Sequence, residues 1–183
     1  MSNAQIYLSG IKNHNETMKA LRNLKELMTE QLRSLYLGDA HLEELLLGFV
    51  RETSDPTLRS LFFKYINQTS DQIIILKRVF NDLFEQKRGG DSNVFIAITQ
   101  EARSQMSLTE GKEIKDALMI LYIQYIIHHK IVMFGSICTY GKLMGFYDDI
   151  SLLHQELERE KKMDRDLAMI AESIVDIKVP QYA

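Results

Sequence analysis

Residues 117–140 read ALMILYIQYIIHHKIVMFGSICTY, and this apolar stretch decides what kind of fold the chain adopts. Its composition would suit a transmembrane helix, but Gln124 and the run His128-His129-Lys130 would then lie near the centre of the bilayer. Polar and charged groups at that depth cost roughly several kcal/mol. We therefore expect a long helix that is buried inside a protein, and no membrane span.

Helix-breaking residues are rare in the rest of the chain. The two prolines are Pro56 and Pro180, and the Gly-Gly pair stands at 89–90. Apolar residues recur three and four positions apart, which is typical of amphipathic helices. This periodicity predicts long helices over about residues 16–53, 56–87, 112–144 and 151–176, and a shorter helix over about 93–107.

Local signals mark two of the helix boundaries. Asp55 and Pro56 suit the N-cap and the first turn of the second helix. Gly145, Asp148 and Asp149 predict the turn before the last helix.

No segment alternates apolar and polar residues as a strand does, so the sequence predicts an all-α fold. Four long helices joined by short loops bury their apolar faces most simply as an up-and-down four-helix bundle, with the short helix as an addition. The expected organisation is an N-terminal extension over 1–15, one helical bundle over 16–176 and a C-terminal tail over 177–183.

The composition narrows the functional classes. With 45% hydrophobic and 26% charged residues, the 183-residue chain is expected to fold as one domain. Its net charge of −3 gives no basic excess for binding phosphate backbones, so we expect no nucleic-acid partner. Cys138 is the single cysteine, which excludes an internal disulfide and fits a reducing cytoplasm. The N-terminus has no pattern of a secretory signal, which also favours a cytoplasmic protein.

A four-helix bundle raises the question of a carboxylate-bridged di-iron site. Such a site uses Glu-x-x-His pairs, because side chains at i and i+3 reach the same metal pair. None of the five histidines has a glutamate three residues before it. His128 and His129 are adjacent and diverge by about 100° around a helix. For each of them a hydrogen-bonded core or interface histidine is favoured over a metal ligand.

Two of the acidic pairs with helical i, i+4 spacing have possible inward faces, namely Asp39 with Glu43 and Glu160 with Asp164. A solvated helix face explains both pairs, and inward-facing carboxylates remain the alternative.

The order of several segments resembles a known family. These segments are LRSLYLGDAHLEELL (32–46), YINQTSDQI (65–73), YIIHHKIVMFGSICTYGKLMGF (125–146) and LLHQELEREKKMDRDL (152–167). Together they resemble the bacterial YciE/YciF family of ferritin-like stress proteins, over about residues 24–175. The resemblance implies a ferritin-like bundle.

The resemblance also implies the positions of a di-metal site, and most of them are substituted in this chain. Where the family carries carboxylates in the second and third long helices, the matching segments here contain Asn67, Gln68, Ile127 and Lys130. Acidic residues are kept at three of the matching positions, namely Asp39, Glu160 and Asp164. We expect Lys130 to pair with one or more of these three acids in place of a metal cation.

We therefore expect a non-catalytic, stress-related structural or interaction protein that has lost its di-metal site and needs no cofactor. The alternative is a di-iron ferroxidase or peroxide-consuming enzyme that binds iron or manganese through an unusual ligand set. That set would be Asp39, His128, Glu160 and Asp164. A third interpretation is one component of a larger assembly.

The helix at 114–140 is apolar on nearly all sides, which predicts burial on more than one side and hence a homodimer. The expected contact residues are Tyr122, Tyr125, His129 and Met133.

Overall fold

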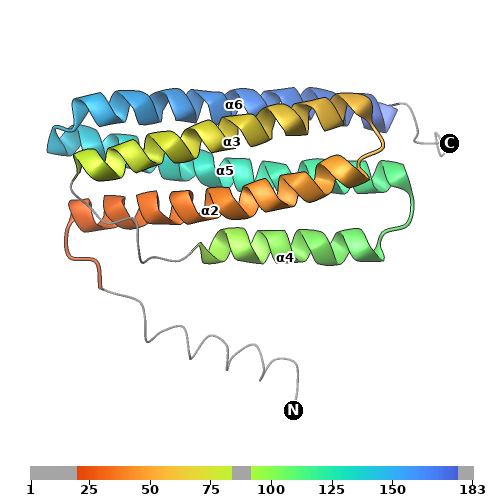
Figure 1. The fold of residues 1–183 in the computed structure, drawn as a ribbon, viewed down its shortest axis with the longest axis horizontal. Helices are drawn as coiled ribbons and strands as arrows, with labels where there is room; N and C mark the ends of the chain where they lie inside the picture. The colour runs from red at the N-terminus through yellow and green to blue at the C-terminus, as the bar shows by residue number, and fades with distance from the viewer. Residues whose placement is uncertain (1–19, 84–91, 177–183) are drawn as a thin grey trace, which may run out of the picture.

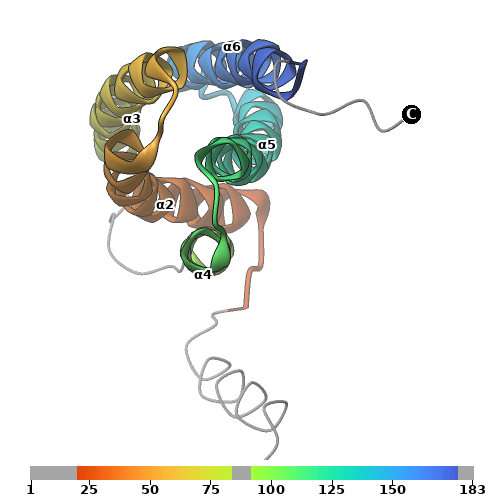
Figure 2. The same ribbon diagram turned by 90° about the vertical axis from the view of Figure 1, so that its right-hand side faces the viewer.

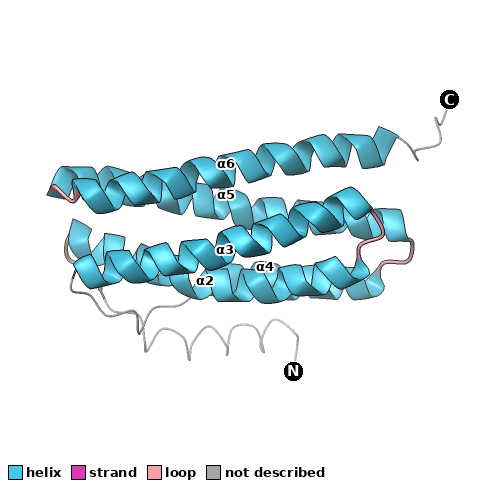
Figure 3. Ribbon diagram, turned by 45° about the horizontal axis from the view of Figure 1, so that its top comes forward, coloured by secondary structure: helices cyan, strands magenta, loops and turns pink. Residues whose placement is uncertain are grey.

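The computed structural model describes residues 20–83 and 92–176, and every regular element in these ranges is an α-helix (Figure 3). The helices are α2 (Leu24–Glu52), α3 (Pro56–Asp82), α4 (Asn93–Leu108), α5 (Lys112–Met144) and α6 (Tyr147–Asp176). This confirms the all-α prediction. The predicted extension at 1–15 and tail at 177–183 lie outside the described residues.

Helix boundaries follow local capping. The Asn23 side chain accepts a hydrogen bond from the Glu26 N–H, so the first long helix begins at Leu24 and not near residue 16. The Asp55 side chain accepts from the Leu58 N–H, and Pro56 occupies the first turn of α3, as predicted.

The last helix begins four residues earlier than predicted. Gly145 ends α5 in the left-handed conformation at φ 83°, and α6 starts at Tyr147. Asp148 and Asp149 therefore lie in the first turn of α6, where carboxylates interact favourably with the helix dipole, and not in a separate turn.

Four helices form the bundle, in the spatial order α2, α3, α6 and α5 (Figures 1 and 2). Neighbouring bundle helices run antiparallel. The helices α3 and α5 point the same way and lie diagonally opposite each other. The short helix α4 lies between α3 and α5 in the sequence and packs outside the bundle against α2 and α5.

Asp116 joins the start of α5 to the turn between α2 and α3. Its carboxylate accepts hydrogen bonds from the Ser54 N–H at 3.1 Å and the Ser54 hydroxyl at 2.6 Å. By length and composition α5 could cross a membrane, yet half of its most apolar window is buried within the described bundle.

A glycine in α2 lets α4 approach closely. A Cβ atom at Gly38 would lie 2.5 Å from the ring of Phe95, which is completely buried. Gly48, in the same helix, has nothing within 4 Å of the corresponding position. Phe95 therefore packs directly on the α2 backbone at Gly38.

Gly38→Ala is expected to lower the free energy of unfolding by about 1–3 kcal/mol, because the new methyl group displaces the Phe95 ring. The matched change Gly48→Ala should raise it by about 0.5–1 kcal/mol, since alanine favours a helix interior and meets no neighbour there. Urea denaturation of both variants measures the difference. Equal effects at the two glycines would contradict the close packing of α4 on α2.

Candidate functional site

A charged side chain lies at the centre of the bundle. Lys130, midway along α5, has no exposed surface, and neither do Asp39 of α2 and Glu160 of α6. The Lys130 Nζ lies 2.8 Å from Asp39 Oδ1 and 3.0 Å from Glu160 Oε1. The predicted pairing of Lys130 with inward-facing carboxylates is therefore confirmed for these two acids.

The fourth helix of the site, α3, supplies neutral hydrogen-bond donors. The Tyr65 hydroxyl donates to Glu160 Oε2 at 2.6 Å, and Gln72 Nε2 donates to Glu160 Oε1 at 3.1 Å. The Lys130 amine also lies 5.4 Å from the centroid of the Tyr65 ring. All four bundle helices thus contribute to one buried polar cluster.

A second glutamate extends the cluster along α6. Glu156, one helical turn before Glu160, is 1% exposed. It accepts hydrogen bonds from Gln72 Nε2 and from an Arg159 guanidinium nitrogen, each at 3.1 Å. Because Arg159 is half-exposed, Glu156 has its own cation at the edge of the bundle and does not depend on Lys130 alone.

The cluster forms because polar residues interrupt the apolar faces of the helices at the same height. On α2, Asp39 lies between Leu35 and Leu42; on α3, Tyr65, Thr69 and Gln72 lie between Leu61 and Leu76; on α6, Glu156 and Glu160 lie between Leu153 and Met163. The helical spacing that makes these faces therefore also turns the polar groups inward.

Asp39 is less well compensated than Glu160. Its nearest cation is Lys130, whose Nζ lies at ion-pair distance from Asp39 Oδ1 but without the angles of a hydrogen bond. The other carboxylate oxygen, Asp39 Oδ2, has no hydrogen-bond partner among the described residues. Burial raises the pKa of Asp39 to about 7, although the nearby Lys130 opposes this shift.

The amine of Lys130 stays protonated at neutral pH. Burial lowers its pKa, but the charges of Asp39 and Glu160 outweigh burial, and the net effect is a raised pKa. Burial, together with the adjacent charge of Glu160, also raises the pKa of Tyr65 well above its usual range. The tyrosine is therefore a neutral donor, and Lys130 is the central positive charge of the cluster.

The ligand set predicted for an enzyme does not converge on one point. Asp39 and Glu160 face Lys130, whereas His128 is largely exposed and lies 3.4 Å from Asp164 at the surface between α5 and α6. Asp164 also accepts a hydrogen bond from Gln124 Nε2 at 3.1 Å. Within residues 20–83 and 92–176, no three His, Cys, Asp or Glu side chains form a group that could hold a metal ion.

The residues at the other positions where the family carries carboxylates have different environments in the structure. Ile127 is a core residue, Gln68 reaches Glu160 only at 3.4 Å, and Asn67 is exposed. Sequence reasoning missed Tyr65, Gln72 and Glu156. The signal available for them was that each is polar at a position where the helical period calls for an apolar residue.

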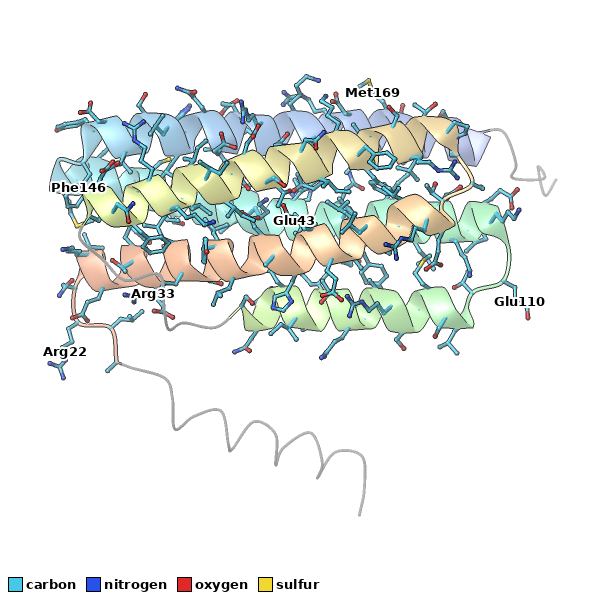
Figure 4. The ribbon with its side chains drawn as sticks, in the orientation of Figure 1. Arg22, Arg33, Glu43, Glu110, Phe146 and Met169 are labelled. Carbon is cyan, nitrogen blue, oxygen red and sulfur yellow. The ribbon has the colours of Figure 1, made fainter. Side chains whose placement is uncertain are left out.

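Nearby Glu43, labelled in Figure 4, lies at the outer edge of the α2–α3 contact and accepts a hydrogen bond from the Ser70 hydroxyl. It is one turn from Asp39 but does not reach the buried cluster, so the two acids of this i, i+4 pair have different environments.

Three of the four predicted dimer-contact residues are covered within the chain. Tyr122 and Met133 are 4% and 6% exposed, and the His129 ring packs edge-on against Phe95 of α4 with 5.2 Å between centroids. Tyr125 is half-exposed. The described helices thus already bury most of the face that the sequence assigned to a partner.

Comparison with known proteins shows where this bundle belongs. The chain is 25% identical to protein YciF of Escherichia coli K12 over 164 residues, which is 89% of this chain and 99% of YciF. The crystal structure of the E. coli stress protein YciF superposes with a TM-score of 0.82 and 24% identity, covering 86% of this chain and all of that one. YcfI of Rhodopseudomonas palustris, for which a structural role has been suggested, matches with a TM-score of 0.78 and 20% identity, covering 82% of this chain and 96% of that one.

These matches confirm the ferritin-like bundle and the resemblance to YciF. A family model with the description "domain of unknown function (DUF892)" matches residues 23–179, which is most of the chain. The chain belongs to the DUF892 family.

Proposed function

We propose that this chain is a non-catalytic, stress-related structural or interaction protein in which Lys130 takes the place of a metal cation. The observation that carries the proposal is the fully buried Lys130 amine, 2.8 Å from Asp39 and 3.0 Å from Glu160. The stress-related part rests on the likeness to YciF, which is described as a stress protein.

The donor set does not suit a metal ion. A cation bound by Asp39 and Glu160 would lie within a few ångströms of the protonated Lys130 amine, and repulsion between like charges is strong in a buried site. A di-metal centre also needs several carboxylates to neutralise its charge. Here two carboxylates face one amine, so the cluster already has its own positive charge.

The cluster also offers little for catalysis. Its central groups, Lys130, Asp39 and Glu160, are completely buried, and Glu160 is hydrogen-bonded on both oxygens. Two surface hollows of about 370 and 510 Å³ lie elsewhere, between α3 and α6 and between α2 and α4, and neither is lined by a cluster residue. A substrate would have to open the bundle core before reaching any of these groups.

Elemental analysis tests this function. The protein should be expressed in medium supplemented with iron and manganese and purified without a chelator or a nickel column. We expect far less than one metal ion per chain, because Lys130 repels a cation from the cluster. A Lys130→Met variant removes the repelling amine. Its matched control is Lys142→Met, which removes an exposed lysine from the same helix.

Near-stoichiometric iron or manganese in the wild-type protein would overturn the proposal. If Glu160→Ala then released that metal, the di-iron ferroxidase or peroxide-consuming function would replace it.

A further inference from the structure

The contact between Lys130 and Asp39 brings an amine and a carboxyl group together in the buried centre of the bundle. The Lys130 Nζ lies 2.8 Å from Asp39 Oδ1, and neither side chain has any exposed surface. The two residues belong to α5 and α2, which pack against each other. Since the contact lacks the angles of a hydrogen bond, no hydrogen bond between them has to break before the nitrogen moves toward the carboxyl carbon. An amine and a carboxylic acid held in this way are the reactants of amide formation.

We propose that Lys130 and Asp39 condense to an isopeptide bond, which joins α5 to α2 covalently, with Glu160 as the proton acceptor. The new bond joins Lys130 Nζ to Asp39 Cγ, and the bond that breaks joins Cγ to the hydroxyl oxygen of the neutral acid. Of the three protons on the lysine ammonium, one remains on the amide nitrogen, one leaves with the hydroxyl as water and one is left on Glu160. The reaction needs no oxidant, reductant or co-reactant.

The two carboxyl groups around Lys130 have different surroundings, and these assign their roles. Glu160 accepts hydrogen bonds from the Tyr65 hydroxyl at 2.6 Å and from Gln72 Nε2 at 3.1 Å. Such donors stabilise a negative charge, and a carboxylate resists attack by an amine. Asp39 has no such donors among the described residues, and burial raises its pKa to about 7. Asp39 is therefore the carboxyl group that reaches the neutral, reactive form near neutral pH.

Glu160 lies where the reaction needs a base. Lys130 is protonated at rest, because the neighbouring charges raise its pKa, and its nitrogen can attack only after giving up a proton. Glu160 Oε1 is 3.0 Å from Lys130 Nζ, which is within reach for direct proton transfer. The cluster thus contains the nucleophile, the electrophile and the base in contact with one another.

Burial favours the condensed form. In water, an ammonium and a carboxylate are well solvated and do not condense. In the bundle core both charges are desolvated at a cost in free energy, and the amide replaces them with a neutral group. Reactants that are fixed in contact also gain an effective molarity that can exceed roughly 10⁵ M.

This proposal starts from the ion pair that carries the proposed function and goes beyond it. A linked chain has lost both the Lys130 cation and the Asp39 carboxylate, so it suits a metal no better than the ion pair does. Asp39 titrates, and Lys130 keeps its charge, only in chains that have not condensed. The mass of the chain separates the two forms.

Intact-mass spectrometry of the full chain tests the isopeptide bond. The purified protein is incubated near pH 7 and denatured, and we expect a species that is lighter than the unreacted chain by one water molecule. Digestion with trypsin, which does not cleave after a modified lysine, should then give peptides 34–51 and 116–142 joined through Asp39 and Lys130.

Three variants test the roles of the individual groups. Lys130→Met should keep its full mass, because it has no nucleophile. Glu160→Gln should condense at least about 100-fold more slowly than the wild type, because it lacks the base. The matched control Asp164→Asn changes an acid one turn further along α6 and should condense like the wild type. Circular dichroism verifies that each variant keeps the helical fold.

A wild-type chain that keeps its full mass after incubation would overturn the proposal, and this result does not depend on any variant. A loss of water without two joined peptides would also overturn it, since a cyclic imide at one aspartate gives the same mass. So would a link from Lys130 to Glu160, or a Glu160→Gln variant that condenses as fast as the wild type. Metal analysis of the same sample keeps the two proposals apart, because metal-free chains of full mass would remove only the isopeptide bond.

Discussion

Lys130→Met is expected to lower the free energy of unfolding by about 3–5 kcal/mol at pH 7, the largest effect of any change considered for this protein. Methionine fills a similar volume, so the loss comes from charge and not from a cavity. Without the amine, Asp39 and Glu160 remain fully buried and have lost their shared cation. Removing one partner of a buried ion pair costs far more than removing the whole pair.

Urea denaturation followed by circular dichroism measures this loss. The control is Lys142→Met on the exposed side of α5, which should change the stability by less than about 0.5 kcal/mol. A triple variant with Lys130→Met, Asp39→Asn and Glu160→Gln should recover most of the stability, because it removes all three buried charges together. If Lys130→Met is as stable as Lys142→Met, the amine does not neutralise the two carboxylates.

Asp39 should make the protein less stable as the pH rises from about 4 to about 7. Its pKa is about 7 in the folded chain and close to the ordinary value of 3.8 when unfolded, so the folded state holds this proton more tightly. Stabilisation by neutral Asp39 is therefore complete below about pH 4 and is lost as the pH passes the folded pKa. The difference between these two pKa values corresponds to about 4 kcal/mol in the free energy of unfolding.

Comparing the wild type with Asp39→Asn isolates this effect. The charged groups that influence the pKa of Asp39 are Lys130 from α5, Glu160 from α6 and, outside the cluster, Glu43 from its own helix, and all of them remain in the variant. We expect the stability difference between the two proteins to change in favour of Asp39→Asn from pH 4 to pH 8, as measured by chemical denaturation at each pH. A difference that stays constant over this range would mean that Asp39 is ionised throughout.

Part of the cluster could be predicted from the chain alone. The positions of Asp39, Lys130 and Glu160 in matching helical segments were sufficient to predict that the amine meets carboxylates. Asp164 was an equal candidate, yet it lies at the surface with His128 and Gln124. Asp164 is one turn beyond Glu160, and which of the two faces Lys130 depends on how α6 is aligned along α5. That alignment comes from packing along the whole helix pair and not from local sequence.

The alignment of the helices also decides the roles of Tyr65, Gln72 and Glu156. Each occupies an inward position by helical period, but the sequence does not say that they share one height with Lys130. Hydrogen bonds of about 3 Å require three helices to be aligned within a fraction of a turn. Only the assembled bundle determines that alignment.

The sequence by itself determined the five helices, most of their boundaries and the bundle class. These depend on caps, breakers and apolar spacing within a few residues of each other, which are local interactions. It did not determine which side of α5 is buried, because a helix that is apolar on nearly all sides has no preferred inward face. The tertiary structure decided this by packing α2, α4 and α6 around α5. This packing covers Tyr122, His129 and Met133 and leaves exposed the apolar side chains of Ile114, Leu121, Tyr125, Val132 and Leu143.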